Sequence, residues 1–105
     1  MRDRDTILNF IYGFHSYGAK KQIIECFTCG YCYWFANILL IRFGRRAEIV
    51  YDQIENHFGC RIDDEVYDIT GIVTKQYNWE SWIDLWEKDS LLAQRIERDC
   101  ILKEN

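Results

Sequence analysis

Three side chains that can carry out acyl chemistry occur in the middle of the sequence, at Cys32, His57 and Asp68. In thiol hydrolases a thiolate attacks a carbonyl carbon, an imidazole takes up and returns the proton, and a carboxylate orients the imidazole. The residue types and their order therefore predict a nucleophile, a base and an orienting carboxylate. They form one site only if the elements that carry them bring the three side chains together.

Cys32 lies near the start of the most apolar segment of the chain, residues 29–43. Apolar side chains recur there at helical spacing on one face, and the opposite face is apolar too, which is typical of a central buried helix. Gly30 precedes the helix and Gly44 ends it, so Cys32 falls in the first turn. Free backbone N–H groups and the helix dipole lower the pKa of a thiol at that position, and the same N–H groups can hold an oxyanion.

His57 and Asp68 lie on two segments with strand character, residues 57–62 and 65–69. The two residues between them, Asp63-Asp64, make a short hairpin connection. The simplest register pairs the last residue of the first strand with the first residue of the second, that is, Ile62 with Glu65.

This register places Gly59 opposite Asp68. Because side chains alternate along a strand, His57 and Asp68 then share a face as diagonal neighbours, about 7–8 Å apart by backbone position. Gly59 has no side chain to block their approach. The other face of the hairpin carries an apolar set suited to a core: Phe58, Cys60, Ile62, Tyr67 and Ile69.

The rest of the chain predicts helices at both ends. Residues 6–14 have helical periodicity, residues 47–51 are rich in strand formers, and the tryptophan-rich segment 79–96 predicts one or two amphipathic helices. Residues 20–27 fit either a helical turn or an extended lead-in. His15 has no carboxylate at a useful spacing, and we expect it at the surface.

The predicted fold is a single α+β domain over residues 1–105, with a central buried helix packed on a small antiparallel sheet of two to three strands. An N-terminal helix and one or two C-terminal amphipathic helices complete it. A length of 105 residues suits one domain, and a net charge of −4 argues against a general nucleic-acid binder. The charged start of the chain, the free cysteines and the lack of a membrane-length apolar run predict a cytoplasmic protein.

Three short motifs surround the candidate residues: Gly-Tyr-Cys-Tyr-Trp-Phe-Ala at 30–36, Asn-His-Phe at 56–58 and Tyr-Asp-Ile-Thr-Gly at 67–71. They resemble small phage-type proteins that look like reduced members of the papain-like and transglutaminase-like superfamily. In that superfamily a cysteine at a helix start is followed by a histidine on one strand and an Asp or Asn on the next, which matches Cys32, His57 and Asp68.

The resemblance covers about the middle half of the chain and implies a thiol hydrolase or acyl-transfer enzyme that acts on a peptide or other acyl substrate without a cofactor. For a phage protein it also implies the cytoplasm of the bacterial host. Reduced domains of this type can lack activity. No separate Gln or Asn is evident for an oxyanion hole, since Asn37 lies too far into the helix.

Zinc binding is an alternative interpretation of the cysteines. Cys26, Cys29 and Cys32 have C-x2-C-x2-C spacing, and Cys26, Cys29, His57 and Cys60 make a tetrahedral ligand set. Against this set, His57 and Cys60 point to opposite faces of a regular strand.

A second alternative is a phage-encoded interaction protein that inhibits a host factor, such as a bacterial defence system in the manner of an anti-CRISPR protein. Its acidic side chains would meet a basic surface, such as a nucleic-acid-binding groove. Two acidic runs suit this role: Asp63, Asp64 and Glu65, or Glu80, Asp84 and Glu87.

Overall fold

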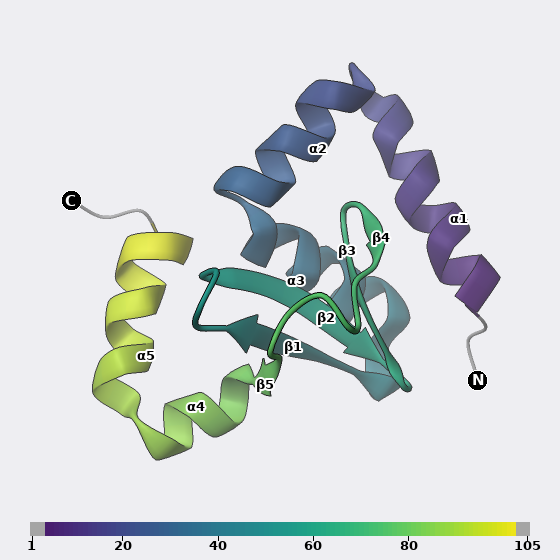
Figure 1. The fold of residues 1–105 in the computed structure, drawn as a ribbon. Coiled ribbons are helices and arrows are strands. Elements are labelled where there is room, and N and C mark those ends of the chain that lie inside the picture. Colours follow the sequence, from purple (N-terminus) through teal and green to yellow (C-terminus); the bar gives the residue numbers. More distant parts are fainter. Residues whose placement is uncertain (1–3, 103–105) are drawn as a thin grey trace.

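The structure is a computed structural model that describes residues 4–102, apart from the side chains of Tyr17, Thr28 and Cys29. Helices flank one sheet, which confirms the α+β class (Figure 1). The helices are α1 (Arg4–Phe14), α2 (Lys20–Cys29), α3 (Cys32–Phe43), α4 (Trp82–Lys88) and α5 (Ser90–Ile96), and a π-helical turn, Glu97–Ile101, follows α5. The strands are β1 (Ala47–Asp52), β2 (His57–Ile62), β3 (Glu65–Asp68), β4 (Gly71–Ile72) and β5 (Glu80–Ser81).

The five strands form one antiparallel sheet in the order β4-β3-β2-β1-β5. β1 and β2 pair along their whole length, from Ala47 opposite Ile62 to Asp52 opposite His57. The prediction of two to three strands is wrong, because β4 and β5 each add two residues at an edge of the sheet. Gly71 begins β4, with a φ of 124° that glycine adopts without strain.

α3 packs against one face of the sheet and forms the centre of the core. The helix begins at Cys32, so the prediction that this cysteine lies in the first turn is confirmed. The prediction that the helix is buried all round is wrong, because the Ile41 side chain is 75% exposed. The core face of the helix is made of Phe35, Ala36, Leu39 and Phe43.

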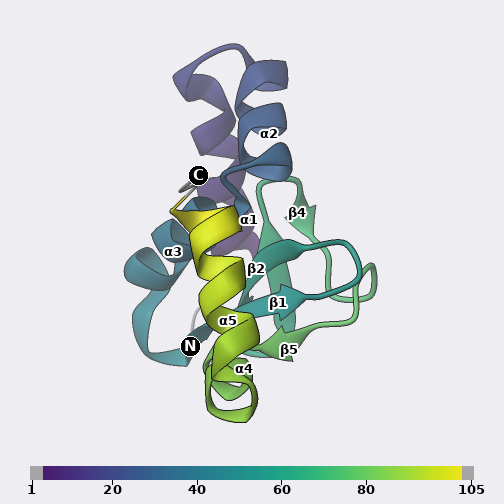
Figure 2. The same cartoon turned by 90° about the vertical axis from the view of Figure 1, so that its left-hand side faces the viewer.

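The hairpin formed by β2 and β3 turns its apolar face toward the core, as predicted. All five residues expected on that face belong to the same buried cluster as α3. The C-terminal helices cover the same core, and Figure 2 shows α3 and α5 on one side of the sheet. They contribute Trp82, Leu85, Ala93 and Ile96, whereas Ile83 and Leu91 on the same helices are exposed.

The other face of the sheet is crossed by the segment between β4 and β5 (Figure 1). This segment closes a second, smaller cluster in which Tyr77 and Trp79 pack on three buried valines, Val50, Val66 and Val73. The spacing of the tryptophans predicted that Trp79 belongs to the C-terminal helix. The structure shows that it does not. The helix begins at Trp82, where the Ser81 hydroxyl accepts a hydrogen bond from the N–H of Asp84.

The ambiguous segment 20–27 is helical and forms most of α2. Within residues 4–102 no single helix has the length and apolar character needed to cross a membrane. A bent pair, Lys20–Phe27 with Cys32–Arg46 at 97°, reaches these limits by length and composition alone.

Candidate active site

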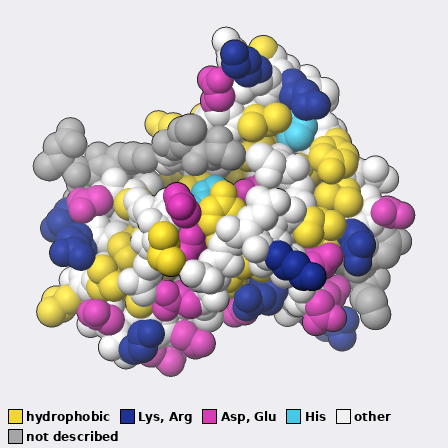
Figure 3. Space-filling view, viewed as in Figure 1, with side chains coloured by type: hydrophobic (Ala, Val, Ile, Leu, Met, Phe, Trp, Pro, Cys, Tyr) yellow, Lys and Arg dark blue, Asp and Glu magenta, His cyan; other side chains and the backbone are white. Residues whose placement is uncertain are grey.

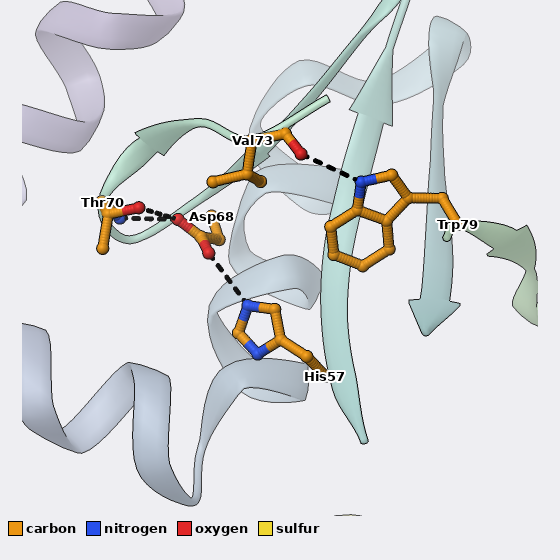
Figure 4. Close-up of polar contacts among 5 residues, drawn as sticks. All are labelled: His57, Asp68, Thr70, Val73 and Trp79. Atoms are coloured by element: carbon orange, nitrogen blue, oxygen red, sulfur yellow. Dashed lines mark hydrogen bonds and ion pairs between the residues drawn. The ribbon is translucent and has the colours of Figure 1, made fainter. Parts of the chain in front are cut away.

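His57 and Asp68 are joined by a hydrogen bond of 2.9 Å between Nε2 and Oδ2 (Figure 4). The register of β2 and β3 pairs Ile62 with Glu65, as the sequence predicted, and the two polar side chains meet on the expected face. Both are almost fully buried, with 5% and 4% of their surface exposed. The hairpin therefore brings the predicted base and the predicted orienting carboxylate together.

The second oxygen of Asp68 is held by its own turn. Oδ1 accepts the backbone N–H of Thr70 at 2.7 Å and the Thr70 hydroxyl at 2.5 Å. A buried carboxylate is tolerated only when its oxygens are hydrogen-bonded, and these contacts leave Oδ2 free for His57. The turn thus fixes the direction in which Asp68 points.

Cys32 lies on the other side of the imidazole, at the start of α3. Its side chain is partly buried and close enough to the His57 ring for the imidazole to lower the pKa of the thiol. Since Nε2 of His57 is bonded to Asp68, Nδ1 is the ring atom left for the thiol. The structure therefore brings together all three residues singled out in the sequence.

The electrostatics of the site favour a thiolate beside an imidazolium. Burial raises the pKa of Cys32, but hydrogen bonds from His57 and the Phe58 backbone, the charge of His57 and a hydrogen bond from the Tyr33 backbone outweigh it, and the pKa is lowered. Burial lowers the pKa of His57, whereas its contacts with Asp68 and Cys32 raise it to about 9. Each group thus stabilises the charged form of its neighbour.

Two aromatic rings cover His57 on the face of the sheet opposite the core. The imidazole lies 4.9 Å from the ring of Tyr77 and 5.9 Å from that of Trp79. The indole Nε1 of Trp79 donates to the Val73 carbonyl at 3.1 Å, which anchors the ring above the strands (Figure 4). A side chain at Gly59 would lie 3.1 Å from this indole, so the glycine makes room for Trp79.

The role of these two aromatic residues was not foreseen. One signal was available: Ser81-Trp-Ile-Asp84 has the Ser-x-x-Asp spacing of a helix start. This signal predicts that the helix begins after Trp79, so the segment before Ser81 is not helical and can cross the sheet. Nothing in the sequence indicates where on the sheet that segment lies.

A hollow of about 400 Å³ opens beside the imidazole and is lined by Glu55, His57, Gln76 and Tyr77. A smaller hollow of about 160 Å³ shares three of these residues and continues toward Lys75. On the face shown in Figure 3, a histidine side chain comes to the surface near the centre, with acidic side chains beside it. The site thus has open space next to the base, which a substrate needs.

A polar network fixes the turn that leads into His57. The Asn56 amide donates to the Cys100 sulfur at 3.0 Å, and its oxygen accepts from the Tyr51 hydroxyl. Asn56 has a φ of 54°, a left-handed conformation that asparagine adopts more readily than most residues. Burial, followed by the charges of Cys100, Asp52, Cys32 and Glu80, raises the pKa of Tyr51 to about 12, so the phenol stays protonated and donates.

The prediction that His15 lies at the surface is wrong, because the residue is buried with 7% of its surface exposed. Its Nε2 donates to the carbonyl of Ile69 at 2.6 Å. This contact ties the end of α1 to the residue that follows Asp68. The burial of His15 depends on a contact with a residue 54 positions further along the chain, which no local sequence pattern reveals.

The predicted zinc ligands gain no support from the side chains that can be placed. Among the described residues no group of three or more His, Cys, Asp or Glu side chains is arranged to hold a metal ion. Cys60 lies in the hydrocarbon core, and burial raises its pKa to about 12, which disfavours the thiolate that zinc requires. Cys26 is exposed, and the side chain of Cys29 lies outside the described residues.

The acidic runs considered for partner binding are partly paired within the molecule. Arg46 contacts Asp63 at 3.1 Å, and Lys88 contacts Glu80 at 3.8 Å. Glu65 accepts from the Thr74 hydroxyl at 2.7 Å. These contacts reduce the charge that either run presents to a partner.

A family model described as Phage YunG-like protein matches residues 9–98 of the chain. The matched segment spans the whole candidate site, from α1 to the last helix. No curated protein and no solved structure matches the chain.

Proposed function

We propose that this chain, which belongs to the phage YunG-like protein family, is a thiol hydrolase or acyl-transfer enzyme of reduced papain-like type. Cys32 is the nucleophile, His57 the base and Asp68 the orienting carboxylate. The observation that carries the proposal is the hydrogen bond of 2.9 Å between His57 and Asp68, together with the proximity of Cys32 to the same imidazole, which lowers the pKa of the thiol. The directions of the two pKa shifts support it, because an activated thiol needs a lowered pKa and a basic partner.

In the first step the Cys32 sulfur bonds to the carbonyl carbon of an amide or ester, and the carbonyl electron pair moves onto oxygen. When the carbonyl re-forms, the bond to the leaving group breaks, and the leaving atom takes the proton held by His57. Water or another acceptor then gives a proton to His57 and attacks the thioester carbon. The carbon–sulfur bond breaks, Cys32 returns to the thiolate, and His57 is again protonated.

Asp68 contributes by holding the imidazole and by stabilising its positive charge. The negative charge on the carbonyl oxygen needs donors of its own. The backbone N–H groups in the first turn of α3 suit that role, because the first N–H groups of a helix have no partner within it. One of them, that of Tyr33, also contributes to the lowered pKa of the Cys32 thiol.

The rate at which iodoacetamide modifies Cys32 tests the proposal, with exposed Cys26 as a reference inside the same molecule. Peptide mass spectrometry separates the two sites. At pH 7 we expect Cys32 to react about tenfold faster or more, since an ordinary thiol is almost wholly protonated there. His57→Ala should remove the advantage while circular dichroism shows an unchanged fold; equal rates at Cys32 and Cys26 in the wild type would reject an activated nucleophile.

The same variants separate this proposal from action through a host protein partner. Inside the bacterial host cytoplasm, where we place the protein, a purely binding role keeps its biological effect in a folded Cys32→Ala variant. A catalytic role loses it. Trapping of an acyl group on Cys32 from an activated ester, seen as a mass increase that is absent in Cys32→Ala, provides a direct second readout.

A further inference from the structure

Glu55 lines the hollow beside His57 and forms no ion pair with the part of the chain that the structure describes. Among the described residues that line this hollow, Glu55 is the charged group that accompanies the imidazole. Lys75 lines the two adjoining hollows but not this one. Within residues 4–102 no lysine or arginine forms an ion pair with Glu55, unlike Asp63, Glu65 and Glu80.

The backbone that carries Glu55 is held in place. The Asp52 carboxylate accepts the N–H of Ile54 at 3.2 Å and that of Glu55 at 3.2 Å. Asn56 follows in its left-handed conformation and is bound to Cys100. The backbone of Glu55 is therefore fixed beside the imidazole, and the charge of Glu55 contributes to the raised pKa of Tyr77 across the hollow, after burial and the charge of Asp68.

The chemistry of the site says which part of a substrate occupies this space. His57 gives its proton to the leaving atom, so the leaving group must lie beside the imidazole. The hollow has His57 in its wall, whereas the acyl part of the substrate is bound to Cys32 at the start of α3. The described lining of the hollow includes the base but not Cys32, so the leaving group suits this space better than the acyl part does.

We propose that Glu55 selects acyl substrates whose leaving group carries a positive charge, such as a protonated amine or a guanidinium. This inference rests on the proposed function and names the substrate class of the same site. An unpaired carboxylate at the mouth of a hollow attracts cations and repels anions, most strongly at low salt.

Thiol reagents of one reaction type and different charge test the inference. Three acetyl thioesters share one acyl group and differ in the charge of the thiol that leaves: cationic thiocholine, anionic 3-mercaptopropionate and neutral 2-mercaptoethanol. In each case the Cys32 sulfur takes the acetyl group, the carbon–sulfur bond to the leaving thiol breaks, and the leaving sulfur takes the proton of His57. The rate is followed as the acetyl mass increase on Cys32. The rate of Cys32 with each charged reagent is divided by its rate with the neutral reagent, and this ratio cancels any change in the nucleophilicity of the thiol. In the wild type at low salt we expect the cationic reagent to be favoured over the anionic one by tenfold or more.

Glu55→Gln should lower this preference several-fold, and Glu55→Lys should reverse it. Asp64→Asn is the matched control: it removes one exposed negative charge at the opposite end of β2, about 20 Å away along the strand, and should leave the preference unchanged. A preference that is the same in Glu55→Gln and the wild type overturns the inference but not the proposed function. A Cys32 that reacts with the neutral reagent no faster than Cys26 overturns both.

Discussion

His57 and Asp68 meet beyond the paired part of their hairpin. The ladder between β2 and β3 runs from Cys60 opposite Tyr67 to Ile62 opposite Glu65, and the hydrogen bond of 2.9 Å joins the two strands past its end. A contact between side chains therefore holds together the part of the hairpin that faces Cys32.

Removing Asp68 should both loosen the hairpin and deactivate the thiol. Asp68→Ala leaves the buried His57 without its partner, and loss of one member of a buried ion pair costs about 3–5 kcal/mol of unfolding free energy, measurable by urea denaturation. Asp68→Asn keeps the shape but not the charge, so the pH profile of Cys32 alkylation should move to higher pH. Thr70→Val is the control; it removes one hydroxyl from Oδ1, costs about 1 kcal/mol and leaves the profile in place.

The pH dependence of stability should reveal the ion pair. Between its ordinary pKa of 6.5 and about 9, His57 keeps a proton in the folded state that the unfolded chain has released, so its stabilising contribution is lost as pH rises through that window. Cys32 acts in the opposite direction: its pKa lies below 9.0, so the folded protein releases a proton that the unfolded chain retains. In the wild type, the dependence of the unfolding free energy on pH that comes from His57 and the one that comes from Cys32 therefore oppose each other.

Cys32→Ser removes the pH dependence of stability that comes from the thiol and leaves the one that comes from His57. We expect the unfolding free energy of the variant, relative to the wild type, to fall as the pH rises above the lowered pKa of Cys32, by as much as about 1.4 kcal/mol per pH unit. The fall ends below pH 9, because Cys32 itself contributes to the raised pKa of His57. Urea denaturation at several pH values measures it; parallel curves for the two proteins would contradict the ion pair.

Two glycine substitutions should have opposite effects. A Cβ at Gly59 would lie 2.9 Å from Cγ1 of Val66 and 3.1 Å from the indole of Trp79, so Gly59→Ala overpacks the small cluster and should cost about 1–3 kcal/mol. Gly13 lies in α1 with nothing within 4 Å, and Gly13→Ala should stabilise by about 0.5–1 kcal/mol. Equal effects of the two changes on the urea midpoint would show that Trp79 is not packed against Gly59.

His15 should be needed as a hydrogen-bond donor. His15→Leu leaves the Ile69 carbonyl unpaired in a buried place and should cost about 1–3 kcal/mol of unfolding free energy. His15→Gln retains an N–H donor and should recover part of the loss. If the leucine variant is as stable as the wild type in urea, the contact at 2.6 Å contributes nothing to stability.

The hairpin was predictable because its information is local. A two-residue connection and strict alternation fix the register, and a slip of one residue would have turned Phe58 and Cys60 out of the core. The start of α3 was marked in the same way, by Gly30 before Cys32. Most of the candidate site is therefore encoded within short segments.

The features that the sequence did not predict depend on contacts between distant segments of the chain. β4 and β5 have two residues each, too few for any periodicity, and exist because β3 and β1 offer them edges. Tyr77 and Trp79 cover His57 because the chain after β4 crosses the sheet, and His15 is buried by a carbonyl far along the chain. No propensity of the residues themselves specifies such pairings.

The position of Trp79 gives the protein an optical reporter. An imidazolium quenches the emission of a nearby indole more strongly than a neutral imidazole does, and the Trp79 ring lies 5.9 Å from that of His57. Intrinsic fluorescence should therefore brighten as His57 loses its proton, and binding in the adjacent hollow should change it as well. Substrates can thus be sought by screening for a spectral change, before any turnover assay exists.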